Sequence, residues 1–311
     1  MSKQVVRGLF TLGAIGMLAL PSCSDIGSSP ADMATAPDLT MVVMAEAHSV
    51  GGSVSGLVGT VVLQNNAGDD LSVGANGSFT FATQVATGAS YAVTVKTHPA
   101  NQICTVAWGT GSITNAAVSN VAVTCGTPTT CKAIKAAIPT AADGNYTIDP
   151  DGAAALPALM AFCDMTTDGG GYTMYGVTGG ISTNRFDQVN SCNAIGLQLV
   201  IPRTKAHLAA LYKKYTAKYF ATVPGVYGLA AGAYTNCAMN SGDAVCGKNW
   251  VALDKGAWFV RGVAYIEPNG DYTPGCWMDN FGMDANGNLM FGDRSCGAAT
   301  GSSYVCSDNA K

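Results

Sequence analysis

The sequence predicts a multi-domain, mostly β protein in which an all-β sandwich is followed by a disulfide-rich α+β domain. Charged residues make up only 12% of the 311 residues and 38 are glycine, a composition typical of chains rich in strands and loops. Residues 49–125 alternate apolar and polar side chains in short runs, as half-buried strands do. Eleven cysteines are widely spaced, without a Cys-x-x-Cys pair, which favours disulfides over a zinc site.

Composition and motifs also exclude some functions. A net charge of -4 provides no basic surface for nucleic acid. Because the chain has no His-Glu-x-x-His, Walker or Gly-x-Ser-x-Gly motif, we expect no enzyme, although scattered carboxylates leave a secreted hydrolase as a less favoured alternative. His207 falls on a predicted helix beside a lysine, where we expect a solvated surface residue.

Residues 1–23 read as an export signal. Lys3 and Arg7 precede an apolar run, 8–20, that is too short to span a bilayer comfortably. The sequence Leu20-Pro21-Ser22-Cys23 resembles a bacterial lipobox, which implies lipidation at Cys23 and an outer-membrane or cell-surface lipoprotein. The lipid anchor would then be the contact with the membrane; cleavage by an ordinary signal peptidase, giving a secreted protein, is the alternative. Ten cysteines remain after Cys23, enough for five disulfides.

Two segments are expected before the cysteine-rich part. Residues 24–46 are rich in Ser, Ala, Pro and Asp and read as a flexible linker, unless the apolar run 41–44 forms a first strand. Residues 47–126 predict an antiparallel β-sandwich module, with Cys104 and Cys125 joining two late strands. This module resembles those that recur in bacterial surface proteins, and we expect a spacer rather than a binding domain.

The head domain, 128–311, opens with a specific motif. Cys131-Lys132-Ala133-Ile134, the segment 144–150 and especially Phe162-Cys163-Asp164-Met165 with its following glycine run resemble fibrinogen-like C-terminal domains over residues 131–175. The resemblance implies a Cys131–Cys163 disulfide. The calcium-loop pattern of the later part of that family is absent, so its binding residues are not carried over. Asp149-Pro150-Asp151-Gly152 predicts a turn rather than a metal site.

Residues 172–311 are similar to C-type lectin-like domains. A cysteine at 192 and a Pro202-Arg203-Thr204 step precede a predicted helix with an apolar face, and residues 250–254 and 257–259 resemble that fold's central strands. The helix face comprises Ala206, Leu208, Leu211 and Tyr212. The resemblance implies three disulfides, which are Cys192–Cys306, Cys276–Cys296 and Cys237–Cys246.

The resemblance also implies a calcium and sugar site. Glu267-Pro268-Asn269 matches the family's triplet for mannose, fucose or N-acetylglucosamine. The carried-over calcium ligands are Glu267, Asn269 and Asp293, with Asp271 as a candidate substitute. Two oxygen ligands of the family pattern are missing, because Pro274 and the Phe291-Gly292 pair stand in their places.

Further candidates surround this triplet. An inserted run, Asp284-Ala285-Asn286-Gly287-Asn288, carries oxygens that suit calcium, although Asn-Gly pairs are more often plain turns. Tyr272, Trp277 and Phe281 are candidates for stacking on a sugar, or for core packing.

The sequence thus predicts an exported cell-surface protein that binds a glycan or glycoprotein ligand without catalysis, with calcium as the candidate cofactor. The alternative is a structural or protein-binding adhesin that contains no metal. Calcium dependence of thermal stability separates the two, because an ion that binds only the folded state raises its melting temperature.

Overall fold

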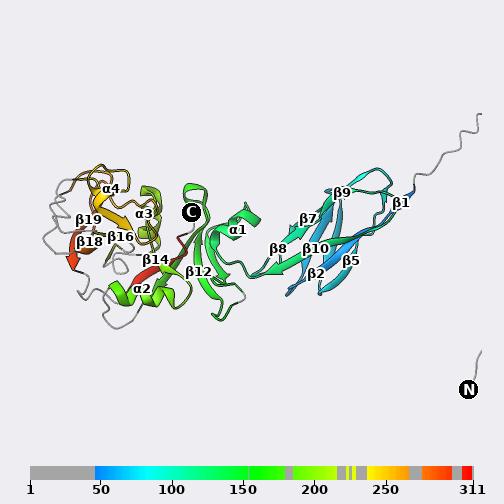
Figure 1. Cartoon of the computed structure of the whole chain (residues 1–311), viewed down its shortest axis with the longest axis horizontal. Coiled ribbons are helices and arrows are strands. Elements are labelled where there is room, and N and C mark those ends of the chain that lie inside the picture. The colour runs from blue at the N-terminus through cyan, green and yellow to red at the C-terminus, as the bar shows by residue number, and fades with distance from the viewer. Residues whose placement is uncertain are drawn as a thin grey trace, which may run out of the picture. The chain divides into compact units, whose positions relative to one another are not determined.

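The computed structural model describes residues 46–152, 154–178, 185–215, 222–223, 226–228, 237–265, 275–295 and 303–309 (Figure 1). The predicted signal peptide, Cys23 and residues 24–45 of the predicted linker lie outside them. None of the described helices combines the length and apolar character needed to cross a bilayer.

The N-terminal β-rich part contains two four-stranded sheets (Figure 1). The first has the order β5 (Gly77–Thr80), β2 (Val50–Ser55), β10 (Val118–Gly126) and β8 (Ile103–Ala107). The second has the order β4 (Asp69–Val73), β3 (Val61–Asn65), β7 (Ser90–Thr97) and β9 (Thr110–Ser112). A short pair, β1 (Ala47–His48) and β6 (Val85–Ala86), completes this part.

Alternation along these strands builds one hydrophobic core. In β3, for example, Val61 and Leu63 are fully buried while Val62 and Gln64 are half-buried. The core cluster draws its buried residues from positions 50 to 125 alone. The prediction of alternating strands is therefore confirmed for this part of the chain.

The expected antiparallel pairing is wrong for one pair of strands. β2 and β10 run parallel, with Gly52 opposite Val121, whereas the other described pairs in these sheets are antiparallel. The two backbones approach closely, since a Cβ atom built on Gly52 would lie 1.7 Å from the carbonyl oxygen of Val121. Alternation shows which face of a strand is buried, but it carries no information on the direction of its neighbour.

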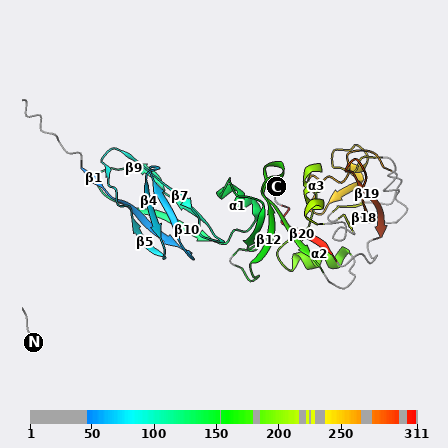
Figure 2. The same cartoon turned by 180° about the vertical axis from the view of Figure 1, so that it is seen from behind.

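The cysteine-rich part begins with a five-stranded sheet (Figure 2). Its order is β11 (Gly144–Ile148), β12 (Leu159–Asp164), β13 (Tyr172–Val177), β20 (Tyr304–Ser307) and β14 (Gln198–Leu199). The helical elements near these strands are α1 (Cys131–Ala137), η1 (Thr167–Gly169), α2 (Arg185–Asn193) and α3 (Lys205–Lys214). Tyr175 on β13 pairs with Cys306 on β20, so the last described strand lies in the sheet whose other strands begin at residue 144.

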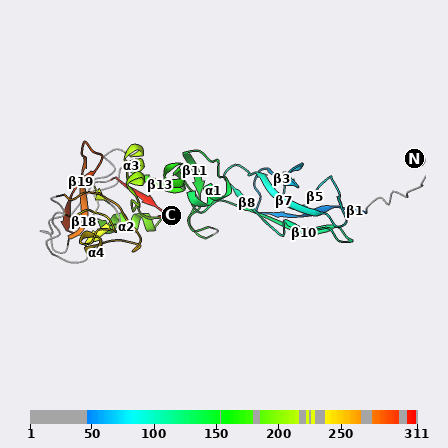
Figure 3. The ribbon, with the colours of Figure 1, turned by 90° about the horizontal axis from the view of Figure 1, so that it is seen from above.

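Smaller sheets complete the cysteine-rich part (Figure 3). One sheet has the order β15 (Thr222–Val223), β18 (Gly275–Met283) and β19 (Leu289–Ser295), and another pairs β16 (Val226–Gly228) with β17 (Trp250–Ala252). A short helix, α4 (Cys246–Asn249), precedes β17. The expected strand at 250–254 is thus present over its first three residues, whereas 257–259 contribute a single bridge from Phe259 to Asn240. Buried side chains of this region form a second core that includes Met239, Trp250, Trp258 and Leu289.

Four predicted disulfides are confirmed. They are Cys104–Cys125, Cys131–Cys163, Cys192–Cys306 and Cys237–Cys246. Cys276 lies on β18 with its side chain outside the described set, and Cys296 lies outside the described residues. Cys276–Cys296 therefore stays a prediction.

Helix α3 is the helix that the sequence predicts, with two corrections, of which the first is that Ala206, expected on the apolar face, is exposed. The Thr204 hydroxyl caps it by accepting the amide N–H of His207 at 3.0 Å, and Leu208 and Leu211 are buried as expected. The expectation of a solvated His207 is wrong, because this side chain is 1% exposed. Its ring stacks on Tyr172 of β13 with centroids 3.6 Å apart, and its Nδ1 accepts the Arg203 amide N–H at 3.2 Å. His207 precedes Leu211 by four residues, so both lie on the packed face of the helix.

Candidate functional site

The predicted calcium and sugar site is described only in part. Glu267, Asn269, Asp271 and Tyr272 lie outside the described residues. Trp277 and Asp293 lie on β18 and β19, and only their backbone is described. Asp284, Asn286 and Asn288 are described with their side chains, in the turn that joins the same two strands.

The register of β18 and β19 separates the candidates into two places. Asp293 pairs with Met278 and lies one position along β19 from Arg294, the partner of Trp277. The turn that contains Asp284 follows the Met283–Leu289 pair. A strand rises about 3.3 Å per residue, so roughly 15 to 20 Å of hairpin separates Asp293 from Asp284. One ion cannot contact both residues, whose oxygens would have to lie within about 2.6 Å of it.

The carboxylate of Asp284 is engaged within its own turn. Its Oδ1 accepts the amide N–H groups of Asn286 and Asn288 at 2.9 and 2.8 Å, and Asn288 Nδ2 lies 3.2 Å from Oδ2. An ion pair with Arg261 completes the set at 3.1 Å. The hydrogen bond from the Asn288 backbone, with further help from the Arg261 charge, lowers the pKa of the Asp284 carboxyl.

Arg261 ties this turn to the second core. The side chain is 7% exposed, and one of its N–H groups donates to the carbonyl oxygen of Leu289 at 3.0 Å. Its guanidinium lies 4.6 Å from the ring centroid of Tyr265. A cation already faces the carboxylate of Asp284, and this arrangement fixes the turn in place.

Cys237, Asp243 and Cys246 form a compact group whose ligand atoms lie within 4.8 Å of one another. Such a group could hold a metal ion if both cysteines were free thiols. Here the two sulfurs are bonded to each other. Asp243 Oδ1 accepts the N–H groups of Val245 and Cys246, both at 2.9 Å, and these donors lower its pKa. The group is therefore a disulfide beside the capped start of α4.

The aspartates between residues 149 and 164 lie in separate turns. The predicted Asp149–Gly152 turn is confirmed by a 2.9 Å hydrogen bond from the Gly152 N–H to the Asp149 carbonyl. Burial and the neighbouring carboxylate of Asp151 raise the pKa of Asp149. Asp164 accepts the N–H groups of Thr166 and Thr167 at 3.1 and 2.9 Å; burial opposes its ionisation, but these hydrogen bonds prevail and lower its pKa.

A pocket of about 240 Å³ lies between helix α3 and the loops beside β12. Its lining includes Asp143, Phe162, Asp164, Thr166, Lys213 and Lys214, and we call it the lysine pocket. This pocket is not among the sites that the sequence predicts. The signal was the spacing of Ala210, Lys213 and Lys214, which puts all three on one face of a helix, but the facing loops come from residues some 45 to 70 positions earlier.

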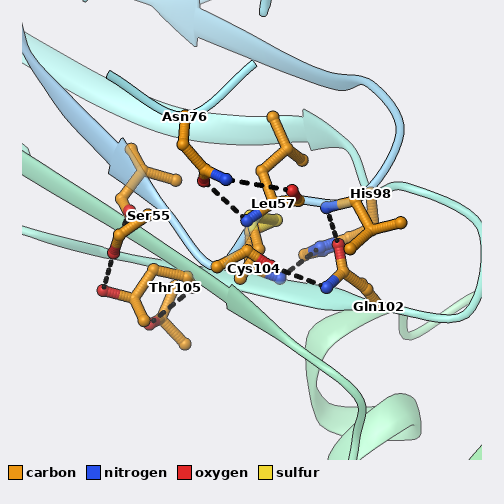
Figure 4. The surroundings of a disulfide bond; sticks show 12 residues. Ser55, Leu57, Asn76, His98, Gln102, Cys104 and Thr105 are labelled. Carbon is orange, nitrogen blue, oxygen red and sulfur yellow. Dashed lines mark hydrogen bonds between the residues drawn. A yellow bond between two sulfur atoms is a disulfide. The ribbon is translucent and has the colours of Figure 1, made fainter. Parts of the chain in front are cut away.

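The disulfide of the β-rich part lies in a structural network (Figure 4). The Asn76 side chain accepts the Leu57 N–H at 2.8 Å and donates to the Leu57 carbonyl at 3.2 Å. Gln102 likewise bridges the Val58 N–H and the Gly56 carbonyl, both at 2.8 Å. His98 Nδ1 accepts the Cys104 N–H at 3.0 Å. These polar side chains form hydrogen bonds with backbone groups of neighbouring loops and strands.

The sequence matches no model of a known protein family and no curated protein.

Proposed function

We propose that this chain is an exported, lipid-anchored cell-surface protein whose cysteine-rich part recognises a carbohydrate or a glycosylated partner without catalysis. The observation that carries the proposal is the Cys192–Cys306 disulfide beside the pairing of β13 with β20. The C-type lectin-like resemblance implied this bond, which joins helix α2 to the last strand. The Cys131–Cys163 disulfide supports the fibrinogen-like opening in the same way.

The proposed sugar site lies at the Gly275 end of the β18–β19 hairpin. There Glu267 and Asn269 precede β18 by a few residues, and Asp293 lies on the paired strand. Trp277 lies one position from the partner of Asp293, and successive positions of a strand alternate between its two faces, so Trp277 is not assigned to this site. Calcium would bind carboxylate and amide oxygens here and leave positions open for two neighbouring sugar hydroxyls.

The melting temperature of the oxidised protein, with millimolar calcium and with chelator, tests this site. We expect calcium to raise it, because an ion that binds only the folded state stabilises that state. The double substitution Glu267→Gln with Asn269→Asp should abolish most of the shift. Asp284→Asn serves as the matched control, because it lies at the far end of the hairpin and should leave the calcium shift intact.

A metal-free adhesin is the second candidate function. The engagement of Asp284 by its own turn and by Arg261 favours it, since the inserted Asp-x-Asn-x-Asn run already has its partners. Equal melting temperatures with calcium and chelator would support this candidate over the calcium site. A shift lost in the Asp284→Asn variant alone would instead put the ion at the turn.

A further inference from the structure

A polar pair interrupts the inner face of the hairpin formed by β3 and β4. Two apolar cross-strand pairs on that face contribute to the core of the β-rich part: Val61 with Val73, and Leu63 with Leu71. The next pair on the same face is Asn65 with Asp69. Polar side chains at core positions are unfavourable unless their polar groups have partners, so this pair indicates a role beyond packing.

Each residue of the pair uses one side-chain oxygen to hold a backbone group. Asn65, which is 2% exposed, accepts the Ala92 N–H on its Oδ1 at 3.1 Å, and Asp69 accepts the Thr83 N–H on its Oδ2 at 2.9 Å. Within the described part of the chain, Asn65 Nδ2 and Asp69 Oδ1 have no hydrogen-bond partner. Since directly opposed residues have Cβ atoms about 5 Å apart, an unused donor and an unused acceptor lie on neighbouring side chains.

Both residues line a pocket of about 470 Å³, which we call the Asn65 pocket. Thr83 and Gln84 add polar side chains to its lining, and Val85 adds an apolar one. The volume lies within the range of roughly 300 to 1,000 Å³ that is usual for pockets with small-molecule ligands. The Asn65 pocket is therefore large enough for a single sugar ring.

The turn beside the Asn65 pocket is fixed against β7. The Asn66 N–H donates to the Ala92 carbonyl, and the Asn66 side-chain amide donates to the Ser90 carbonyl, both at 3.0 Å. The Gly68 N–H donates to the Asn65 carbonyl at 3.2 Å. A preformed wall lowers the ordering cost that a ligand would otherwise have to offset.

The unused groups restrict the class of ligand. Asp69 is the one charged residue among those that line the pocket, so the pocket does not favour an anion. A metal ion requires electron-pair donors, and an ammonium group contains no acceptor, so neither suits the Asn65 N–H. A hydroxyl group both accepts and donates, and can therefore satisfy Asn65 and Asp69.

We propose that the Asn65 pocket binds a neutral sugar ring, without calcium, through neighbouring hydroxyl groups. These hydroxyl groups accept the unused N–H of Asn65 and donate to Asp69 Oδ1. The choice of a sugar over other neutral hydroxyl compounds rests on the proposed function, glycan recognition. The β-rich part, which the sequence predicts to be a spacer, then has a binding site of its own.

The test is a titration of the full chain, with its disulfides intact and chelator present, followed by saturation-transfer NMR. The probes are glucose, galactose and mannose in turn, with N-acetylglycinamide as a compound that has amide donors and acceptors but no ring hydroxyl groups. We expect saturable binding of at least one hexose. N-acetylglycinamide should bind more weakly by about tenfold or more.

One variant removes the unused acceptor. Asp69→Asn keeps an oxygen for the Thr83 N–H but puts an amide nitrogen in place of Oδ1, and should weaken hexose binding about tenfold or more. Asp70→Asn is the matched control, because it makes the same change one position along β4 and hence on the opposite face. It should bind as the unaltered chain does.

A second variant fills the pocket and leaves its polar groups in place. A Cβ atom on Gly68, which lines the pocket, would lie 3.8 Å from the Asn66 carbonyl oxygen, an ordinary contact. Gly68→Leu should therefore fold and lose hexose binding. Gly74→Leu is its control, since Gly74 has similar room, 3.8 Å from the Thr60 hydroxyl oxygen, but does not line the Asn65 pocket.

Three outcomes overturn the proposal: no saturable hexose binding in chelator, unchanged affinity in both pocket variants, and equal losses in the pocket variants and their controls. N-acetylglycinamide binding as tightly as the hexoses overturns the choice of a sugar. Hexose binding that appears only with calcium, and that Asp69→Asn leaves unchanged, overturns the Asn65 pocket while the proposed function stands. Binding in chelator that Asp69→Asn weakens supports the pocket even where the calcium site of the proposed function fails.

Discussion

His98 makes the stability of the β-rich part depend on pH. Its Nδ1 accepts the Cys104 N–H, which only an imidazole unprotonated at that nitrogen can do. Burial lowers the pKa of His98 in the folded protein below its ordinary value of about 6.5. On acidification the unfolded chain therefore takes up this proton first. The stability that His98 contributes is complete above about pH 6.5 and is lost as the pH falls below it.

We predict that His98→Asn flattens this pH dependence. The asparagine Oδ1 can accept the same N–H, but it does not titrate. The melting temperature should fall less between pH 8 and pH 5 in the variant than in the unaltered chain, measured by circular dichroism. Parallel curves for the two proteins would contradict the role given to His98.

His207 shows that the polarity of a side chain does not by itself decide whether that side chain is buried or exposed. Its lysine neighbour Lys205 is exposed, yet His207 itself stacks on Tyr172 and its backbone N–H donates to the Thr204 cap. Burial, and next the charge of Asp168, raise the pKa of Tyr172 above its ordinary value. The phenol therefore stays neutral across the physiological range.

Among the elements, the parallel pair β2–β10 depends on one residue without a side chain. A Cβ atom on Gly52 would meet the backbone of Val121, and backbone cannot move aside as a flexible side chain can. We predict that Gly52→Ala lowers the free energy of unfolding of the β-rich part by about 3 kcal/mol or more. Urea unfolding of the two proteins measures this difference.

Gly74→Ala is the control for that prediction. A Cβ atom there would lie 3.8 Å from the Thr60 hydroxyl oxygen, which is an ordinary contact. The change should therefore shift the free energy of unfolding by less than about 1 kcal/mol. Equal effects at Gly52 and Gly74 would show that the close approach of β2 and β10 is not what excludes a side chain at residue 52.

For the whole molecule, the disulfides differ in how much chain they close. Cys192 and Cys306 are separated by 114 positions, but Cys237 and Cys246 by only 9. In the chain-entropy model the longer loop stabilises the folded state by about 4 to 5 kcal/mol and the shorter by about 2.5 kcal/mol. The long bond also joins α2 to β20, the last described strand of the five-stranded sheet.

We predict that removing the longer disulfide is the more damaging change. Cys192→Ala with Cys306→Ala should lower the free energy of unfolding more than Cys237→Ala with Cys246→Ala does, measured in the same denaturant series. The unfolding of the β-rich part, which has its own core, should be unaffected by either pair. Similar losses from both pairs would contradict the dependence on loop length.

Local sequence patterns by themselves determined many structural features of this protein. Period-two alternation located the strands between residues 49 and 125, and the spacing of Leu208 and Leu211 located helix α3. Residue motifs and the resemblances they carry led to four disulfides that the structure contains. These features can be predicted from the sequence because each depends on residues close in sequence or on a short, specific motif.

Tertiary structure alone decided the rest. The parallel pairing at Gly52, the burial of His207, the ion pair of Asp284 with Arg261 and the lysine pocket all join residues far apart in the chain. No local period records which distant backbone or side chain a residue will meet. The packing of separate elements sets these contacts, and with them the charges that a ligand would encounter.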